Sequence, residues 1–479
     1  MATAKRSGTT PSDPTSAGIF SEAQRRTLTA LAEGFVAGGG AARAAAAETA
    51  IAKVVDPALH GQLRLVLNLL DTRVGSLLIG GRLVRFGTLK ATQRDEFLRR
   101  WVQHPVPMLR SGAAVFRKLL SFIAYSDADE PADALVRTRL SALGYNPTPN
   151  AATANVTKIT AFDPGPAERI AVDVLVIGSG AGGGSIARDL SAAGREVLVI
   201  EAGGLYTEET FPTKERDAYE RLYLDSGFTA TADAHIAILA GGTVGGGTTV
   251  NWMTAIPIPE PVREEWEGEH GVTGASGREF ANDLNAVLKE IGAKDSQDVP
   301  LKDAAIIRGA EKLGWSSERI QMNRAECSDC GTCTFGCKVG SKQSSLRLHL
   351  AQAVANGARI LPDCKAERLV FENGAATGAM TTFGTRAGSP RTLEIIAKTV
   401  VVSGGALRTP VLLQRSGLTH PAIGKNLRLH PVSLVAGVFD EPVEMWRGTM
   451  QAAKSSRFID PDEGRTGYII ERAHGHTGL

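Results

Sequence analysis

The sequence lacks a charge imbalance, a long uncharged apolar run and any abundance of aromatic residues, which make up only 5% of it. Its 53 basic and 51 acidic side chains leave a formal net charge of +2, which gives no support for a nucleic-acid partner or a strongly charged membrane-binding surface. No uncharged apolar segment approaches the roughly 20 residues that span a bilayer. The N-terminus has no apolar segment of a secretory signal, so we expect a cytoplasmic protein and leave a peripheral membrane contact open.

Cysteine is also scarce, yet four of the five cysteines fall close together. They are Cys327, Cys330, Cys333 and Cys337. In a reducing compartment such clustering indicates metal or redox chemistry before disulfides. The spacing C-x2-C-x2-C-x3-C is that of bacterial ferredoxins and predicts an iron–sulfur cluster. Lys338 stands where ferredoxins have proline, and Cys364 is a spare candidate ligand. Thiols without a metal, and zinc or disulfides, stay open as alternatives.

Composition and periodicity predict an all-α N-terminal domain followed by an α/β domain. In the helical part, Ser21 and Gln24 form a capping-box pattern, and Leu28, Leu31 and Phe35 share one helix face. The predicted divisions are a disordered tail at 1–18, a helical domain at 19–145, a linker at 146–170, an α/β domain at 171–435 with a Cys-rich insert at 325–345, and the start of a further domain at 436–479.

A nucleotide-binding pattern opens the α/β domain. An apolar strand leads into Gly178, Gly180 and Gly183, which fit G-x-G-x-x-G. A helix beginning near Ala181 would hold phosphates at its N-terminus, where free N–H groups and the dipole favour anions. The following strand ends in Glu201, whose carboxylate can accept hydrogen bonds from ribose hydroxyls. This fingerprint predicts a dinucleotide and does not choose between FAD and NAD.

Two further glycine-rich segments make that choice. "GGTVGGGTTVNW" begins at Gly241, and "GGALRTPVLLQRSGL" begins at Gly404. With the fingerprint, they resemble the glucose-methanol-choline (GMC) family of flavin oxidoreductases. The resemblance implies a Rossmann-like FAD-binding domain, here 171–435, with an interleaved substrate domain. It also implies further FAD-binding residues, namely Gly245, Gly246, Thr248, Asn251 and Gly405.

Within that family, the helical N-terminal part and the Cys segment followed by "GSKQSS" look like the long-chain (fatty) alcohol oxidases. This likeness implies oxidation of a hydrophobic primary alcohol, long-chain or aryl, to an aldehyde by hydride transfer to flavin N5. Electrons would pass to oxygen, or through an iron–sulfur cluster to another acceptor. A non-catalytic flavin-binding subunit, completed by a second chain, is the alternative. The two flavin-loop segments disfavour an NAD-dependent dehydrogenase.

No catalytic residue is assigned from the sequence. The family's general-base histidine belongs to a C-terminal segment beyond the position matching "HPV", and this chain shows no such histidine, so we expect a truncated substrate domain at 436–479. His474 and His476 are predicted to lie at the surface. His430 is predicted to be structural, and His235 and Asn251 could lie near the flavin.

Overall fold

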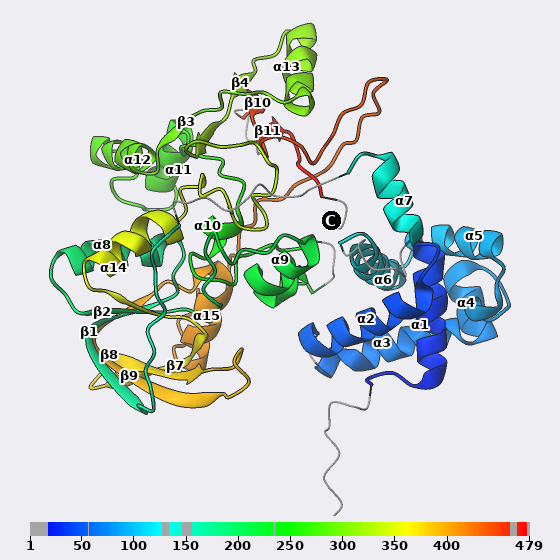
Figure 1. Ribbon diagram of the computed structural model, residues 1–479, viewed down its shortest axis with the longest axis horizontal. Helices are drawn as coiled ribbons and strands as arrows, with labels where there is room; N and C mark the ends of the chain where they lie inside the picture. Colours follow the sequence, from blue (N-terminus) through cyan, green and yellow to red (C-terminus); the bar gives the residue numbers. More distant parts are fainter. Residues whose placement is uncertain are drawn as a thin grey trace, which may run out of the picture. The chain divides into compact units, whose positions relative to one another are not determined.

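The computed structural model describes residues 18–55, 57–126, 134–145, 156–232, 236–459 and 467–476. The chain divides into two compact units. One contains the described residues up to Gly144 and those of Ala230–Ala237, and the other is built from Tyr145–Thr229 and Ile238–His476 (Figure 1). Almost all of the predicted disordered tail and the first half of the predicted linker lie outside the described residues. Within the described residues, no helix is long and apolar enough to cross a membrane.

The N-terminal unit is helical. Its helices are α1 (Glu22–Phe35), α2 (Gly40–Val54), α3 (Pro57–Leu70), α4 (Arg73–Gly80), α5 (Ala91–Val102), α6 (Pro107–Ser126) and α7 (Ala134–Ala142). The capping box at α1 forms, because the Ser21 N–H donates to Gln24 Oε1 and the Gln24 N–H donates to Ser21 Oγ. Leu28 and Leu31 of α1 are fully buried, so this face of the helix packs into the unit's core.

A mixed six-stranded sheet is the centre of the second unit. Its strand order is β6-β2-β1-β9-β8-β7, in which β6, β2, β1 and β9 are parallel and the last two pairs antiparallel. The strands are β1 (Arg169–Ile177), β2 (Val197–Ile200), β6 (Arg359–Leu361), β7 (Cys364–Glu372), β8 (Ala375–Phe383) and β9 (Arg391–Val402). The predicted α/β, Rossmann-like class is therefore confirmed. Parallel strands covered on both faces read as continuous apolar runs, as "VLVI" does in both β1 and β2.

Helices on this sheet begin where its parallel strands end. Helix α8 (Ala181–Ala192) follows β1 and packs against α14 (Ala351–Ala355), and α15 (Gly405–Arg415) follows β9 and packs on β7. In register, Ile177 at the end of β1 lies opposite Ile200 of β2 and Val402 of β9. The carboxyl ends of the three strands therefore meet at one edge, which is where open α/β sheets bind ligands.

The second unit also contains two smaller sheets. Strands β10 (Ala453–Phe458), β11 (Tyr468–Glu471) and β4 (Glu318–Arg319) make one antiparallel sheet, and β3 (Ala293–Asp295) pairs with β5 (Gln321–Asn323). In the sequence β4 precedes the Cys segment, whereas β10 and β11 lie in the predicted region 436–479. The first of these sheets therefore joins two parts of the chain that lie far apart in the sequence. The remaining helices of the unit are α9 (Glu215–Leu222), α10 (Gly247–Val250), α11 (Glu260–Gly268), α12 (Arg278–Glu290) and α13 (Leu301–Leu313).

Candidate functional site

The turn between β1 and α8 forms a tight corner that requires glycine at positions 178 and 183. Gly178 has φ +99°, and a Cβ there would lie 2.4 Å from the carbonyl oxygen of Ser403. A Cβ at Gly183 would lie 1.9 Å from the carbonyl oxygen of Gly178. Gly180 is the N-cap of α8 and offers no side-chain hydrogen bond to the helix, and Ala181 is exposed. The first N–H groups of α8 are thus left for an anion.

Glu201 lies at this corner and is joined to it through a serine. Its Oε2 accepts hydrogen bonds from the Ser179 N–H at 3.1 Å and from Ser179 Oγ at 2.7 Å, while Oε1 accepts from the Gly203 N–H at 3.0 Å. Ser179 is fully buried, and its Oγ also accepts from the Gly245 N–H at 3.0 Å. Our sequence reasoning missed Ser179. Its position between the first two glycines of the fingerprint is the signal that could have identified it.

The segment Gly245–Asn251 packs directly against this corner. Gly246 has φ +56°, and a Cβ there would lie 2.8 Å from Gly180 Cα. Thr248 Oγ1 donates to the Gly245 carbonyl at 2.6 Å and accepts from the Ser345 N–H at 2.9 Å. Asn251 follows α10 and is exposed. Gly245, Gly246 and Thr248 are therefore brought to the fingerprint or beside it, although they lie far along the chain from it. We call Gly245–Asn251 the flavin loop, after its predicted role.

Ser345 is a second residue that the sequence reasoning missed. Its Oγ donates to the carbonyl of Gly180 at 3.1 Å, so it fastens the start of α8 to the flavin loop. Gly405 begins α15 with φ +75° and is exposed, and Ser403, two residues earlier, contacts Gly178. The N-termini of α8 and α15 thus open at the same sheet edge.

These features fit an adenine dinucleotide such as FAD. A backbone corner without Cβ atoms allows close approach of a pyrophosphate, and an uncapped helix N-terminus supplies donors for it. The Glu201 carboxylate has acceptor capacity beyond the three hydrogen bonds it receives. The assignment of individual residues to FAD stays a prediction.

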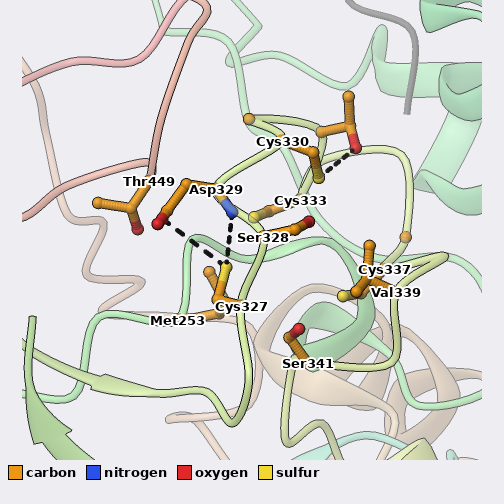
Figure 2. A pocket seen from close by; sticks show the side chains of 13 residues that line it. Met253, Cys327, Ser328, Asp329, Cys330, Cys333, Cys337, Val339, Ser341 and Thr449 are labelled. Carbon is orange, nitrogen blue, oxygen red and sulfur yellow. Dashed lines mark hydrogen bonds between the residues drawn. The ribbon is translucent and has the colours of Figure 1, made fainter. Parts of the chain in front are cut away.

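The four clustered cysteines line one pocket, which we call the cysteine pocket (Figure 2). Met253, Asp329 and Thr449 also line it. Cys327 Sγ lies 3.8 Å from Asp329 Oδ1, and Cys330 Sγ lies 3.1 Å from Thr332 Oγ1. In the described part of the chain all five thiols are free, and no three sulfurs lie within 4.8 Å of one another. A single tetrahedral ion with Zn–S bonds of about 2.3 Å needs closer sulfurs than this.

Burial favours the neutral thiol at two of the four clustered cysteines. Burial raises the pKa of the Cys333 thiol far above its ordinary value, whereas a positive charge on Lys342 lowers it and charge on any of the other three clustered cysteines would raise it further. Burial likewise raises the pKa of Cys327. Metal ligation requires thiolates, so a bound metal would have to offset this cost.

Cys364, the predicted spare ligand, does not line the cysteine pocket. It lies on β7 in the apolar core of the large sheet, where its thiol donates to Thr381 Oγ1 at 3.3 Å. Burial raises its pKa to about 11. The structure therefore gives Cys364 a packing role, and the prediction that it could be a ligand finds no geometric support.

The prediction that His474 and His476 lie at the surface is wrong. Each is only 5% exposed. The His476 ring lies 4.5 Å from the Phe335 ring between centroids, and Lys302 Nζ lies 2.8 Å from His474 Nδ1. Burial lowers the pKa of His474 to about 2 and that of His476 to about 4. The sequence could not reveal this, because the segment after β11 is buried by residues of the distant Cys segment.

The other histidines named from the sequence add little to the site. His430 is exposed in a stretch without regular secondary structure, so the predicted structural role has no packing behind it. His235 lies outside the described residues.

Comparison with known proteins agrees with this geometry. Residues 219–432 match the profile of the family described as GMC oxidoreductase. The long-chain-alcohol oxidase FAO3 of Arabidopsis thaliana is 38% identical over 282 residues, covering 57% of this chain and 38% of its own length. FAO4B of the same plant is 30% identical over 442 residues, covering 81% and 59%. The chain thus spans about half the length of these curated relatives. A formate oxidase structure from Aspergillus oryzae aligns at a TM-score of 0.41 with 17% identity, covering 53% of this chain and 48% of its own.

Proposed function

Because this chain belongs to the GMC oxidoreductase family, on its long-chain-alcohol-oxidase-like branch, we propose that it binds FAD and oxidises a hydrophobic primary alcohol, long-chain or aryl, to the aldehyde. The observation that carries the proposal is the hydrogen-bonded junction at the glycine corner, where Ser179 joins Glu201 to Gly245. That junction brings the nucleotide fingerprint and the flavin loop into one site.

FAD, when bound, supplies the hydride acceptor for the alcohol carbon. The residues of this chain bind and orient it. The N–H groups at the start of α8 would hold the phosphates, and Glu201 would accept hydrogen bonds from the ribose. The flavin loop, which ends at the exposed Asn251, would help to hold the flavin. We assign no general base among the described residues.

Anaerobic spectroscopy tests this function. The purified chain, loaded with FAD, is mixed with decanol or benzyl alcohol, and absorbance is followed near 450 nm. We expect the flavin band to bleach with either alcohol, and decane to leave it unchanged as the matched control. If the flavin binds tightly and neither alcohol bleaches it, alcohol oxidation by this chain is wrong. The second candidate, a flavin-binding or electron-transfer protein, would then be favoured.

We also propose that the cysteine pocket carries an iron–sulfur cluster that passes electrons from the flavin to an external acceptor. The ferredoxin spacing and the gathering of all four sulfurs around one pocket support it. Iron and acid-labile sulfide are measured on anaerobically reconstituted protein. We expect about four of each per chain, as in a [4Fe–4S] cluster. Fewer than one iron per chain would contradict the cluster, and oxygen would then be the acceptor we favour.

A further inference from the structure

Lys342 is a lysine side chain buried between the cysteine pocket and the flavin loop. It is 2% exposed, and its Nζ donates to three main-chain carbonyl oxygens, each at 2.8 Å. Those carbonyls belong to Thr249, Asn251 and Cys333. Two of them end the flavin loop, and the third lies in the Cys segment. One ammonium group therefore joins two segments that are about 80 residues apart in the sequence.

The three hydrogen bonds use all the donors that an ammonium group has. Neutral carbonyls orient the group but do not cancel its charge. Burial lowers the pKa of Lys342, whereas charge on Cys333, Cys337 or Cys330 would raise it. Three oxygen acceptors around Nζ suit the protonated form, which has three donors. In the described part of the chain no carboxylate pairs with Lys342, and the carboxylate of Asp329, which lines the cysteine pocket, is already paired with Arg324 at 2.6 Å.

A buried ammonium group that no carboxylate pairs is costly. Hydrophobic residues of similar volume would usually fill such a position at lower cost. The cost therefore points to a use for the charge at this place, where Lys342 contacts both the flavin loop and the Cys segment that is proposed to carry electrons.

We infer that Lys342 is a positioning residue that fixes the end of the flavin loop to the Cys segment and places a positive charge beside the flavin. A nearby positive charge favours the reduced, more negative flavin and so raises its midpoint potential. The arrangement also makes the flavin loop depend on the conformation of the Cys segment. The flavin part of this inference rests on the function proposed above, whereas the joining of the two segments does not.

The test compares two neutral variants of the full chain with a matched lysine. Lys342→Met removes the charge and the donors, and Lys342→Gln keeps a donor but removes the charge. Lys338→Met is the control, because Lys338 donates to a single main-chain carbonyl, that of Phe211 at 2.9 Å, from the same Cys segment.

Hydrogen–deuterium exchange is measured first, without FAD. We expect Lys342→Met to speed exchange in peptides covering both 245–253 and 327–337, and Lys338→Met to leave 245–253 unchanged. Faster exchange in 327–337 alone would overturn the joining of the two segments. This measurement does not depend on flavin binding. A wild-type chain that binds no flavin would refute the proposed function and leave the joining of the two segments to be decided by the exchange rates.

The flavin midpoint potential is measured next by dye-coupled reduction. We expect both Lys342→Met and Lys342→Gln to shift the potential to more negative values, while Lys338→Met leaves it at the wild-type value. If Lys342 acted only by joining the two segments, Lys342→Gln would keep the wild-type potential, because glutamine keeps a hydrogen-bond donor. Unchanged potentials in both neutral variants would overturn the electrostatic part of the inference.

Discussion

At the scale of single residues, the glycine corner depends on contacts that admit no side chain. A Cβ at Gly183 would lie 1.9 Å from the Gly178 carbonyl oxygen and 3.3 Å from Ser403 Cβ. Both neighbours belong to the sheet edge itself and cannot move without shifting β1 or β9. Gly182, its neighbour on α8, is exposed and has open space where a Cβ would stand. The two glycines therefore form a matched pair for mutation.

We predict that Gly183→Ala weakens FAD binding at least tenfold and costs about 1–3 kcal/mol of unfolding free energy, because helix α8 must move away from β1. Gly182→Ala should keep FAD affinity within about threefold and gain up to about 1 kcal/mol from helix propensity. Titration with FAD and chemical denaturation measure both. Equal affinities in the two variants would show that the close packing at Gly183 does not shape the site.

His476 is predicted to make stability depend on pH. Burial lowers its pKa from 6.5 to about 4 in the folded state. Between these values the unfolded chain binds a proton that the folded chain does not, so stability is present above pH 6.5 and is lost as pH falls toward 4. From pH 7.5 to pH 5 the loss from this one group is about 2 kcal/mol.

We therefore expect His476→Gln to lose less unfolding free energy than wild type when denaturation is compared at pH 7.5 and pH 5. His270→Gln is the control, because the His270 side chain is 59% exposed. A wild-type pH dependence that the His476 substitution leaves intact would disprove this assignment. His474, whose pKa is also lowered by burial, contributes in the same direction in every variant.

At the scale of elements, strands and helices with a strong local pattern could be predicted, and the contacts between distant loops could not. The fingerprint predicts that Gly178, Gly183 and Glu201 lie at one turn, and the structure brings them together there, because strand, turn and helix follow one another directly. Ser345 carries no comparable local signal, since its partners Thr248 and Gly180 lie 97 and 165 residues away in the sequence. The burial of Lys342 could not be predicted from the sequence either, because lysine side chains are usually exposed to solvent.

The flavin loop should depend on the hydroxyl of Thr248. This hydroxyl closes the loop on the Gly245 carbonyl and receives the N–H of Ser345. We predict that Thr248→Val weakens FAD binding several-fold and lowers the unfolding free energy by about 1–3 kcal/mol, because a part-buried N–H loses its acceptor. Thr229→Val, which removes a hydrogen bond to exposed Asp225, is the control and should change neither. Identical FAD affinities in the two variants would contradict the role given to Thr248.

At the scale of the whole molecule, the chain combines a helical N-terminal unit with an α/β unit. In the α/β unit, β4 pairs with β10, although the two strands lie far apart in the sequence. The α/β class follows from the sequence because alternating apolar strands and amphipathic helices permit few arrangements. The burial of His474 and His476 could not be predicted from the sequence, because it depends on how the chain after β11 packs on the Cys segment. The site's nucleotide half was therefore more predictable than its cysteine half.

The central claim is that FAD binds at the glycine corner opened by Gly178 and bounded by Glu201 and the flavin loop. The most direct test is equilibrium titration of the purified, folded chain with FAD, followed by absorbance and flavin fluorescence, with Gly183→Ala in parallel. We predict one FAD per chain, bound at micromolar or lower dissociation constant and weakened at least tenfold by the substitution. A folded chain that stays colourless in excess FAD, or that binds it equally well with alanine at position 183, would contradict the account.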